Sequence, residues 1–168
     1  MGESIKSKFR PSNPLKYMGD PNNIICRSSW ERKMCQWCDT QPNVLKWASE
    51  EFSIPYVSPK DSKVHRYYPD FLIEFRDVNG KTKKQIIEVK PKKQTRPPER
   101  KSRVTKSYLY ESVTYEINMA KWKAASEFAK DNGIEFKIIT EDELGIKQNG
   151  RGTRRVSKKR HPKNRRSH

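Results

Sequence analysis

Two strand-like segments joined by a short polar link constrain the fold of this chain more than any other feature. Residues 66–76 and 84–90 are rich in aromatic and β-branched residues. The link between them contains Asn79-Gly80, a dipeptide that favours tight hairpin turns. We therefore expect an antiparallel hairpin, and any fold proposed for the chain must bury one of its faces.

The hydrophobic pattern also predicts the register of this hairpin, because a slip of one residue turns every side chain to the other face. If the numbers of two residues paired across the hairpin had an odd sum, carboxylates and core side chains would lie on the same faces of the hairpin. An even sum places Phe71 and Ile87 on one apolar face. It gathers Asp70, Glu88 and Lys90 on the opposite face. We therefore expect an even sum and a polar site on one side of the hairpin.

Further elements surround the hairpin. Apolar residues at helical spacing predict a short helix after Ser28 and a long helix from Ser107 to Asn132. Strands are expected over residues 44–57 and 134–140, with a capped turn of helix after the second. The order is helix, three strands, helix, strand. This order predicts an α/β fold with a mixed sheet.

The chain of 168 residues has the length of one domain with flanking segments. We expect an extended N-terminal arm over residues 1–20, a single domain over 21–147, and a basic tail over 148–168 that is disordered until bound. No apolar segment approaches the roughly 18 residues that span a bilayer, and no signal-peptide core is visible. Neither a membrane span nor a secreted form is expected.

The net charge of +17 favours a polyanionic partner, and its distribution suggests which one. Residues 151–168 contain nine of the 37 Lys and Arg residues and no acid, and residues 81–106 contain eleven bases and two acids. Nucleic acid is the commonest partner of such basic segments, and phosphate contacts would make binding salt-dependent. The alternative is a solvated, solubilising surface.

The candidate nucleic-acid-binding residues follow the hairpin directly, in a segment that contains Pro97 and Pro98. These are Lys92, Lys93, Arg96, Arg100, Lys101 and Arg103. We expect a loop that grips the DNA backbone. The alternative is a loop that stays mobile and solvated.

Acidic residues are scarce, and Glu31, Asp70 and Glu88 fall where they could converge. Carboxylates beside a phosphate backbone make sense where a divalent cation lies between them, since Mg²⁺ prefers oxygen ligands. Lys90 lies on the same side of its strand as Glu88, where an ammonium could act on a water or a phosphate. Each residue also has a plainer explanation. In particular, Glu31 could close a capping box with Ser28, and Lys90 could be a solvated strand end.

The three cysteines, Cys26, Cys35 and Cys38, are expected to be buried free thiols. Their number is odd, and the only histidine within the domain is His65, so a zinc site lacks an obvious set of four ligands. A zinc or redox role is the alternative.

These residues carry a resemblance to known nucleases. Pro69-Asp70 followed by Glu88-Val89-Lys90 resembles the PD-(D/E)xK signature of the restriction-endonuclease-like superfamily, and Glu31 resembles the acid that many members carry on the first helix. The expected element order is similar to the αβββαβ core of that superfamily. The segment from Lys8 to Glu31, together with the YPDF, EVKP and TEDEL segments, is similar to head completion nucleases of T4-like bacteriophages.

The resemblance implies a restriction-endonuclease-like fold and a DNA nuclease, an endonuclease, an exonuclease or both, that requires Mg²⁺ or Mn²⁺. Glu31, Asp70, Glu88 and Lys90 would be catalytic, and the metal would bind Asp70, Glu88 and the carbonyl of Val89, with Glu31 assisting. It implies action on packaged double-stranded DNA before heads join tails, in the host cytoplasm during assembly or on the virion. Phage head, portal or neck proteins would be the partners.

Two other interpretations stay open at the level of sequence. One is a structural DNA-binding protein of the phage head on a nuclease-like scaffold without turnover. The other is an RNA-binding protein. The first shares the basic segments but does not require the carboxylates to converge.

Overall fold

The computed structural model describes residues 6–146, so residues 1–5 and 147–168 lie outside the described part of the chain. The predicted basic tail over residues 148–168 is among the residues not described. Within residues 6–146, none of the helices has an apolar stretch long enough to cross a membrane.

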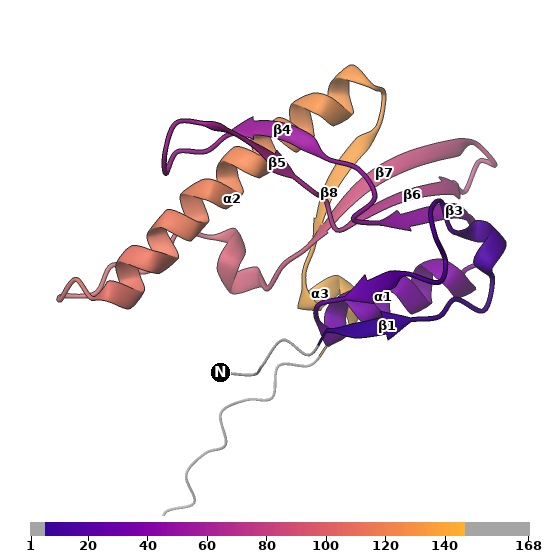
Figure 1. Cartoon of the computed structure of the whole chain (residues 1–168), viewed down its shortest axis with the longest axis horizontal. Helices are drawn as coiled ribbons and strands as arrows, with labels where there is room; N and C mark the ends of the chain where they lie inside the picture. Colours follow the sequence, from indigo (N-terminus) through magenta and orange to yellow (C-terminus); the bar gives the residue numbers. More distant parts are fainter. Residues whose placement is uncertain (1–5, 147–168) are drawn as a thin grey trace, which may run out of the picture.

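A four-stranded mixed sheet forms the middle of the fold (Figure 1). In spatial order its strands are β3 (Val44–Ser49), β6 (Phe71–Arg76), β7 (Thr82–Val89) and β8 (Glu135–Ile139). β6 pairs antiparallel with β3 and with β7, whereas β8 is parallel to β7. The long helix α2 (Lys106–Asp131) makes the crossover that a parallel neighbour requires. The expected α/β fold with a mixed sheet is confirmed.

The helices lie on both faces of this sheet (Figure 1). On one face, Met34 and Cys38 of α1 (Ser29–Thr40) pack with Trp47 and Phe71, and the short α3 (Glu141–Leu144) adds Leu144. On the other face, the α2 residues Ala125 and Ala129 pack with Ile86 and Leu72. The two sides of the β6–β7 hairpin are therefore both buried near its middle.

The register of the β6–β7 hairpin agrees with the prediction. Phe71 pairs with Ile87 and Arg76 with Thr82, so the paired numbers have an even sum. The connecting loop is held by the Asp77 side chain, whose Oδ1 accepts hydrogen bonds from the backbone N–H groups of Asn79 and Lys81 at 2.9 Å. Gly80 has a φ of 76°, a conformation that glycine adopts without strain. The turn and the hydrophobic pattern thus select the same pairing.

Residues 6–20 correct the prediction of an extended arm over residues 1–20. Residues 6–20 contain β1 (Ser7–Phe9) and a 3₁₀ turn, η1 (Pro14–Lys16), and β1 pairs with β2 (Ile24–Cys26). Phe9 and Tyr17 are buried and meet Trp47 edge-on, with ring centroids 6.0 Å and 4.7 Å from it. The two aromatic residues are too widely spaced in sequence to produce a periodic signal, so only the tertiary contact with Trp47 reveals their role.

Two expected strands are divided in the structure. The segment 44–57 forms β3 and then β4 (Ile54–Val57), and the break begins at Glu50, which has a φ of 53°. The segment 66–76 is interrupted before β6 by Pro69, which has no N–H to donate to a ladder. The residues before this break belong to β5 (Val64–Tyr67), which pairs with β4 in a separate hairpin that packs on α2.

The remaining predicted elements agree with the structure. α1 begins after Ser28, and α2 begins after Thr105, whose side chain accepts a hydrogen bond from the Tyr108 N–H. α3 has the capping box predicted from Thr140 and Glu143. A short 3₁₀ turn, η2 (Lys92–Thr95), forms in the basic segment that was expected to be a loop. The three cysteines are free and buried, as expected.

Candidate active site

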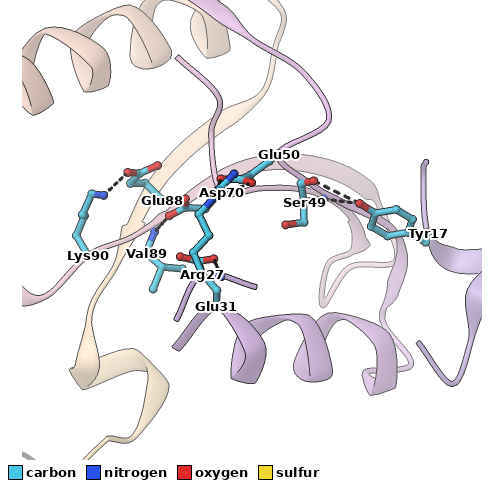
Figure 2. A network of polar contacts seen from close by, with 9 residues as sticks. All are labelled: Tyr17, Arg27, Glu31, Ser49, Glu50, Asp70, Glu88, Val89 and Lys90. Atoms are coloured by element: carbon cyan, nitrogen blue, oxygen red, sulfur yellow. Dashed lines mark hydrogen bonds and ion pairs between the residues drawn. The ribbon is translucent and has the colours of Figure 1, made fainter. Parts of the chain in front are cut away.

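The candidate site lies where the two strands of the β6–β7 hairpin separate, at the end opposite its turn (Figure 2). The ladder ends at the pair of Phe71 and Ile87. Directly beyond it, Asp70 Oδ2 accepts a hydrogen bond of 2.8 Å from the backbone N–H of Val89. The Asp70 side chain thus takes the place of a backbone partner at the open end of the hairpin and is held in a defined position.

Glu88 is the next-to-last residue of β7 and is only 3% exposed. Its Oε1 lies 3.1 Å from the Lys90 Nζ, and its Oε2 accepts a hydrogen bond of 2.5 Å from the Tyr67 hydroxyl. A buried carboxylate is tolerated only with such partners. Glu88 is therefore not simply an exposed residue on a half-solvated strand.

The charges of Asp70, Glu88 and Lys90 lie close enough to shift pKa values within the site. Burial raises the pKa of Asp70 well above its usual value, and the nearby Glu88 charge raises it further, against the Val89 N–H and Lys90. Burial alone would lower the pKa of Lys90, but the carboxylates of Glu88 and Asp70 outweigh it and the net shift is upward. Two close carboxylates thus share one ammonium group. A bound cation would relieve the excess negative charge.

Glu31 is placed beside this group rather than within it (Figure 2). Its backbone N–H donates to the Ser28 Oγ at 3.1 Å, and its Oε2 accepts a hydrogen bond of 2.7 Å from the Arg27 N–H. Ser28 therefore caps the helix, but the Glu31 carboxylate bonds the Arg27 N–H rather than the Ser28 N–H, so it does not close the capping box that the sequence left open. Its charge still contributes to the raised pKa values of Asp70 and Lys90, so it lies within electrostatic reach.

The donor atoms at the open end of the hairpin fit a small divalent cation. Within residues 6–146, no group of three or more His, Cys, Asp or Glu side chains is arranged to hold a metal ion. Mg²⁺ does not require one, because it commonly binds one or two carboxylates and completes its shell with waters and substrate oxygens. Asp70, Glu88 and the carbonyl of Val89 would supply hard oxygen ligands of that kind.

Sequence reasoning missed two residues that meet at this site. The hydroxyl of Tyr67 reaches Glu88, and the Nζ of Lys121, on α2, lies 5.7 Å from the ring centroids of Tyr67 and Tyr56. Burial, and then the charge of Lys90, lowers the pKa of Lys121. A signal for Lys121 exists in the sequence, since it is a cation on the helix face that buries Ala125 one turn later.

Arg27 and Glu50 support the position of Asp70. The Arg27 Nε lies 3.0 Å from the Glu50 Oε1, and the Glu50 N–H donates to the Asp70 carbonyl at 3.2 Å. The left-handed conformation of Glu50 turns the chain out of β3 and makes this contact possible. No sequence pattern indicates a positive φ at a glutamate, so the contact between Glu50 and Asp70 was not predicted.

The predicted nucleic-acid-binding residues are all exposed, but they do not form one uniform surface. Lys92 anchors the segment to α3, because its Nζ lies 2.6 Å from Asp142 and its N–H donates to Glu141. Lys93, Arg96 and Lys101 line a cleft against α2. Arg100 and Arg103 are exposed and do not line that cleft.

Comparison with known proteins agrees with this geometry. A family model described as "TnsA-like endonuclease N terminal" matches residues 41–141. The matched range includes the whole mixed sheet, α2 and the residues Asp70, Glu88 and Lys90, whereas Glu31 precedes it. The chain is also 40% identical over 145 residues to the head completion nuclease of Enterobacteria phage T4. This alignment covers 84% of this chain and 94% of that protein. Nucleases with the restriction-endonuclease-like fold generally use divalent metal ions.

Proposed function

Because the chain belongs to the TnsA-like endonuclease family and is therefore a nuclease, we propose that it is a metal-dependent DNA nuclease whose reaction takes place at Asp70, Glu88 and Lys90. One observation carries this proposal. The two carboxylates converge at the open end of the hairpin, with Lys90 ion-paired to the more buried of them. A structural DNA-binding protein would have no need for this costly arrangement.

Asp70 and Glu88 would hold Mg²⁺ or Mn²⁺ together with the carbonyl of Val89. When bound there, the ion would polarise the scissile phosphate and lower the pKa of a water molecule. The chain itself supplies orientation. The Val89 N–H directs the Asp70 carboxylate, the Tyr67 hydroxyl directs Glu88, and the Lys90 ammonium is available to a water or a phosphate oxygen.

Glu31 is proposed to assist from the start of α1. Its carboxylate is held by the Arg27 N–H, and its charge is felt by Asp70 and Lys90. An acid in the first turn of a helix is favoured by the helix dipole, so Glu31 can stabilise α1 and contribute negative charge to the site at once. We assign Glu31 this supporting role.

The substrate is proposed to be double-stranded DNA, in keeping with a net charge of +17. The exposed cations from Lys92 to Arg103 would contact phosphates beside the cut. The similarity to the T4 head completion nuclease suggests action on packaged DNA during phage head completion, before heads join tails. The site of action would be the host cytoplasm during assembly or the virion, with phage head, portal or neck proteins as partners.

Cleavage of linear and circular DNA by the purified full-length protein tests this proposal. We expect cleavage with Mg²⁺ or Mn²⁺ and none with EDTA, and loss of cleavage in Asp70→Ala and Glu88→Ala. Lys60→Ala, a change at an exposed position outside the site, is the control and should leave the rate unchanged. Nicking of circular DNA would establish an endonuclease mode, and cleavage confined to linear DNA an exonuclease mode. Cleavage that persists in both alanine variants would refute the assignment.

A further inference from the structure

A second feature adjoins the site, a cleft of about 890 Å³ between the segment 93–101 and the N-terminal half of α2. In Figure 1 this half of α2 extends beyond the sheet. Lys and Arg residues of the segment form one wall, and polar or aromatic residues of the helix form the other. The residues that matter here are Lys93, Arg96, Lys101, Tyr110, Tyr115 and Asn118.

Both walls of the cleft begin at the candidate site. On one side, Lys93 follows Lys90 by three residues in the chain. On the other, Asn118 precedes Lys121 by three positions on α2, which is about 4.5 Å along the helix axis. Lys121 interacts electrostatically with both Lys90 and Glu88. On both of its walls, the cleft therefore ends within three residues of a lysine of the candidate site.

The chemistry of the walls suits a base as well as a phosphate. Tyr110 is 74% exposed, so its ring is available to stack. Asn118 lines the cleft from the helix side and is 8% exposed. Its side-chain amide has both a donor and an acceptor, which match the groups on the edge of a nucleobase.

The charge of the cleft favours a single strand over a duplex. Glu99 and Glu111 line the cleft together with its three Lys and Arg residues. The cleft therefore lacks the uniformly positive surface that follows the phosphates of a duplex. Bases in a duplex are already stacked and paired, and they cannot reach tyrosine rings or a recessed amide. Unpaired bases can, because every base has a π-face.

We propose that this cleft binds an unpaired strand of DNA beside the cut site, so that the preferred substrate is DNA with a single-stranded stretch. The inference rests on the proposed nuclease function for the position of the cut, and it rests on the cleft alone for the binding of the strand. The two parts can therefore be tested separately.

Binding measured in EDTA isolates the cleft from catalysis. Fluorescent single-stranded DNA, blunt duplex, and duplex with a single-stranded extension are titrated with the full-length protein and with the double variant Tyr110→Leu/Tyr115→Leu. We expect the double variant to lose about tenfold or more in affinity for the first and third DNAs, with little change for blunt duplex. The matched variant Tyr110→Phe/Tyr115→Phe keeps both rings and should bind like the wild type.

Cleavage rates then connect the cleft to the site. With Mg²⁺, the wild type should cut extended duplex faster than blunt duplex, and the leucine variant should lose this preference. Tyr110→Leu alone changes an exposed residue, so a loss of preference in this single variant would not be explained by a folding defect. Equal losses for all three DNAs, or none, would overturn the cleft proposal even if Asp70→Ala abolishes cleavage. Selective binding without any cleavage would instead overturn the nuclease assignment and leave the cleft proposal standing.

Discussion

The two ends of the β6–β7 hairpin carry the same kinds of charged side chain in opposite environments. Near the turn, the Lys84 Nζ lies 3.7 Å from Glu74, and these side chains are 53% and 27% exposed. At the open end, the Lys90 Nζ lies 3.1 Å from Glu88, and these side chains are 27% and 4% exposed. One pair is part of the surface, whereas the other is enclosed by the fold.

The two aspartates of the hairpin show the consequence. At the turn, the backbone N–H of Lys81 lowers the pKa of Asp77. At the open end, burial and the charge of Glu88 raise the pKa of Asp70. The same residue type is thus stabilised as an anion in one place and destabilised as an anion in the other. An acid held against its preferred ionisation is typical of a functional site rather than of a structural contact.

Replacing each aspartate by asparagine should separate the two ends most clearly. Asp70→Asn should reduce DNA cleavage by about a hundredfold or more, since a proposed metal ligand loses its charge. Asp77→Asn should leave the cleavage rate unchanged. The measurement is the initial rate on linear DNA in Mg²⁺ for both variants. Equal losses in the two variants would contradict the distinction between the ends.

The same two variants should differ in stability with the opposite sign. The folded state binds the Asp70 proton more tightly than the unfolded chain does, so wild-type stability falls as the pH rises through the folded pKa. Asp70→Asn should therefore raise the free energy of unfolding at pH 7 in EDTA, and this gain should shrink as the pH is lowered. Asp77→Asn should lower it at pH 7, because the lowered pKa of Asp77 contributes stability that is lost only in acid. Urea unfolding at several pH values measures both.

Removing the lysine of each ion pair gives the next largest effect. Lys90→Met should lower the free energy of unfolding by about 2 to 4 kcal/mol, because it leaves the buried Glu88 carboxylate without its cation. Lys84→Met should change it by less than about 1 kcal/mol, as is usual for exposed pairs. Urea titrations at pH 7 without metal make the comparison. A loss in Lys84→Met as large as that in Lys90→Met would show that burial does not distinguish the pairs.

The sequence predicted the open end of the hairpin better than its surroundings, and the reason is physical. Burial of Phe71 and Ile87 determines the register, and the register alone places Asp70 and Glu88 on the same face. Tyr67 and Lys121 come from elements that meet the site only after the β4–β5 hairpin packs on α2. Neither local spacing nor composition contains that packing. For the same reason the contacts of Phe9 and Tyr17 with Trp47 were not predicted.

Salt should produce the smallest and most discriminating difference between the two pairs. In a double-mutant cycle, Glu74→Gln with Lys84→Met should give a coupling energy of about 0.2 to 1 kcal/mol in low salt. Because the Debye length falls to about 3 Å at 1 M salt, this coupling should nearly vanish there. The cycle of Glu88→Gln with Lys90→Met should keep most of its coupling, since protein atoms rather than ions surround Glu88. A coupling at the open end that disappears with salt would mean that solvent reaches Glu88, and the site would then lack the low-dielectric surroundings on which its electrostatics depend.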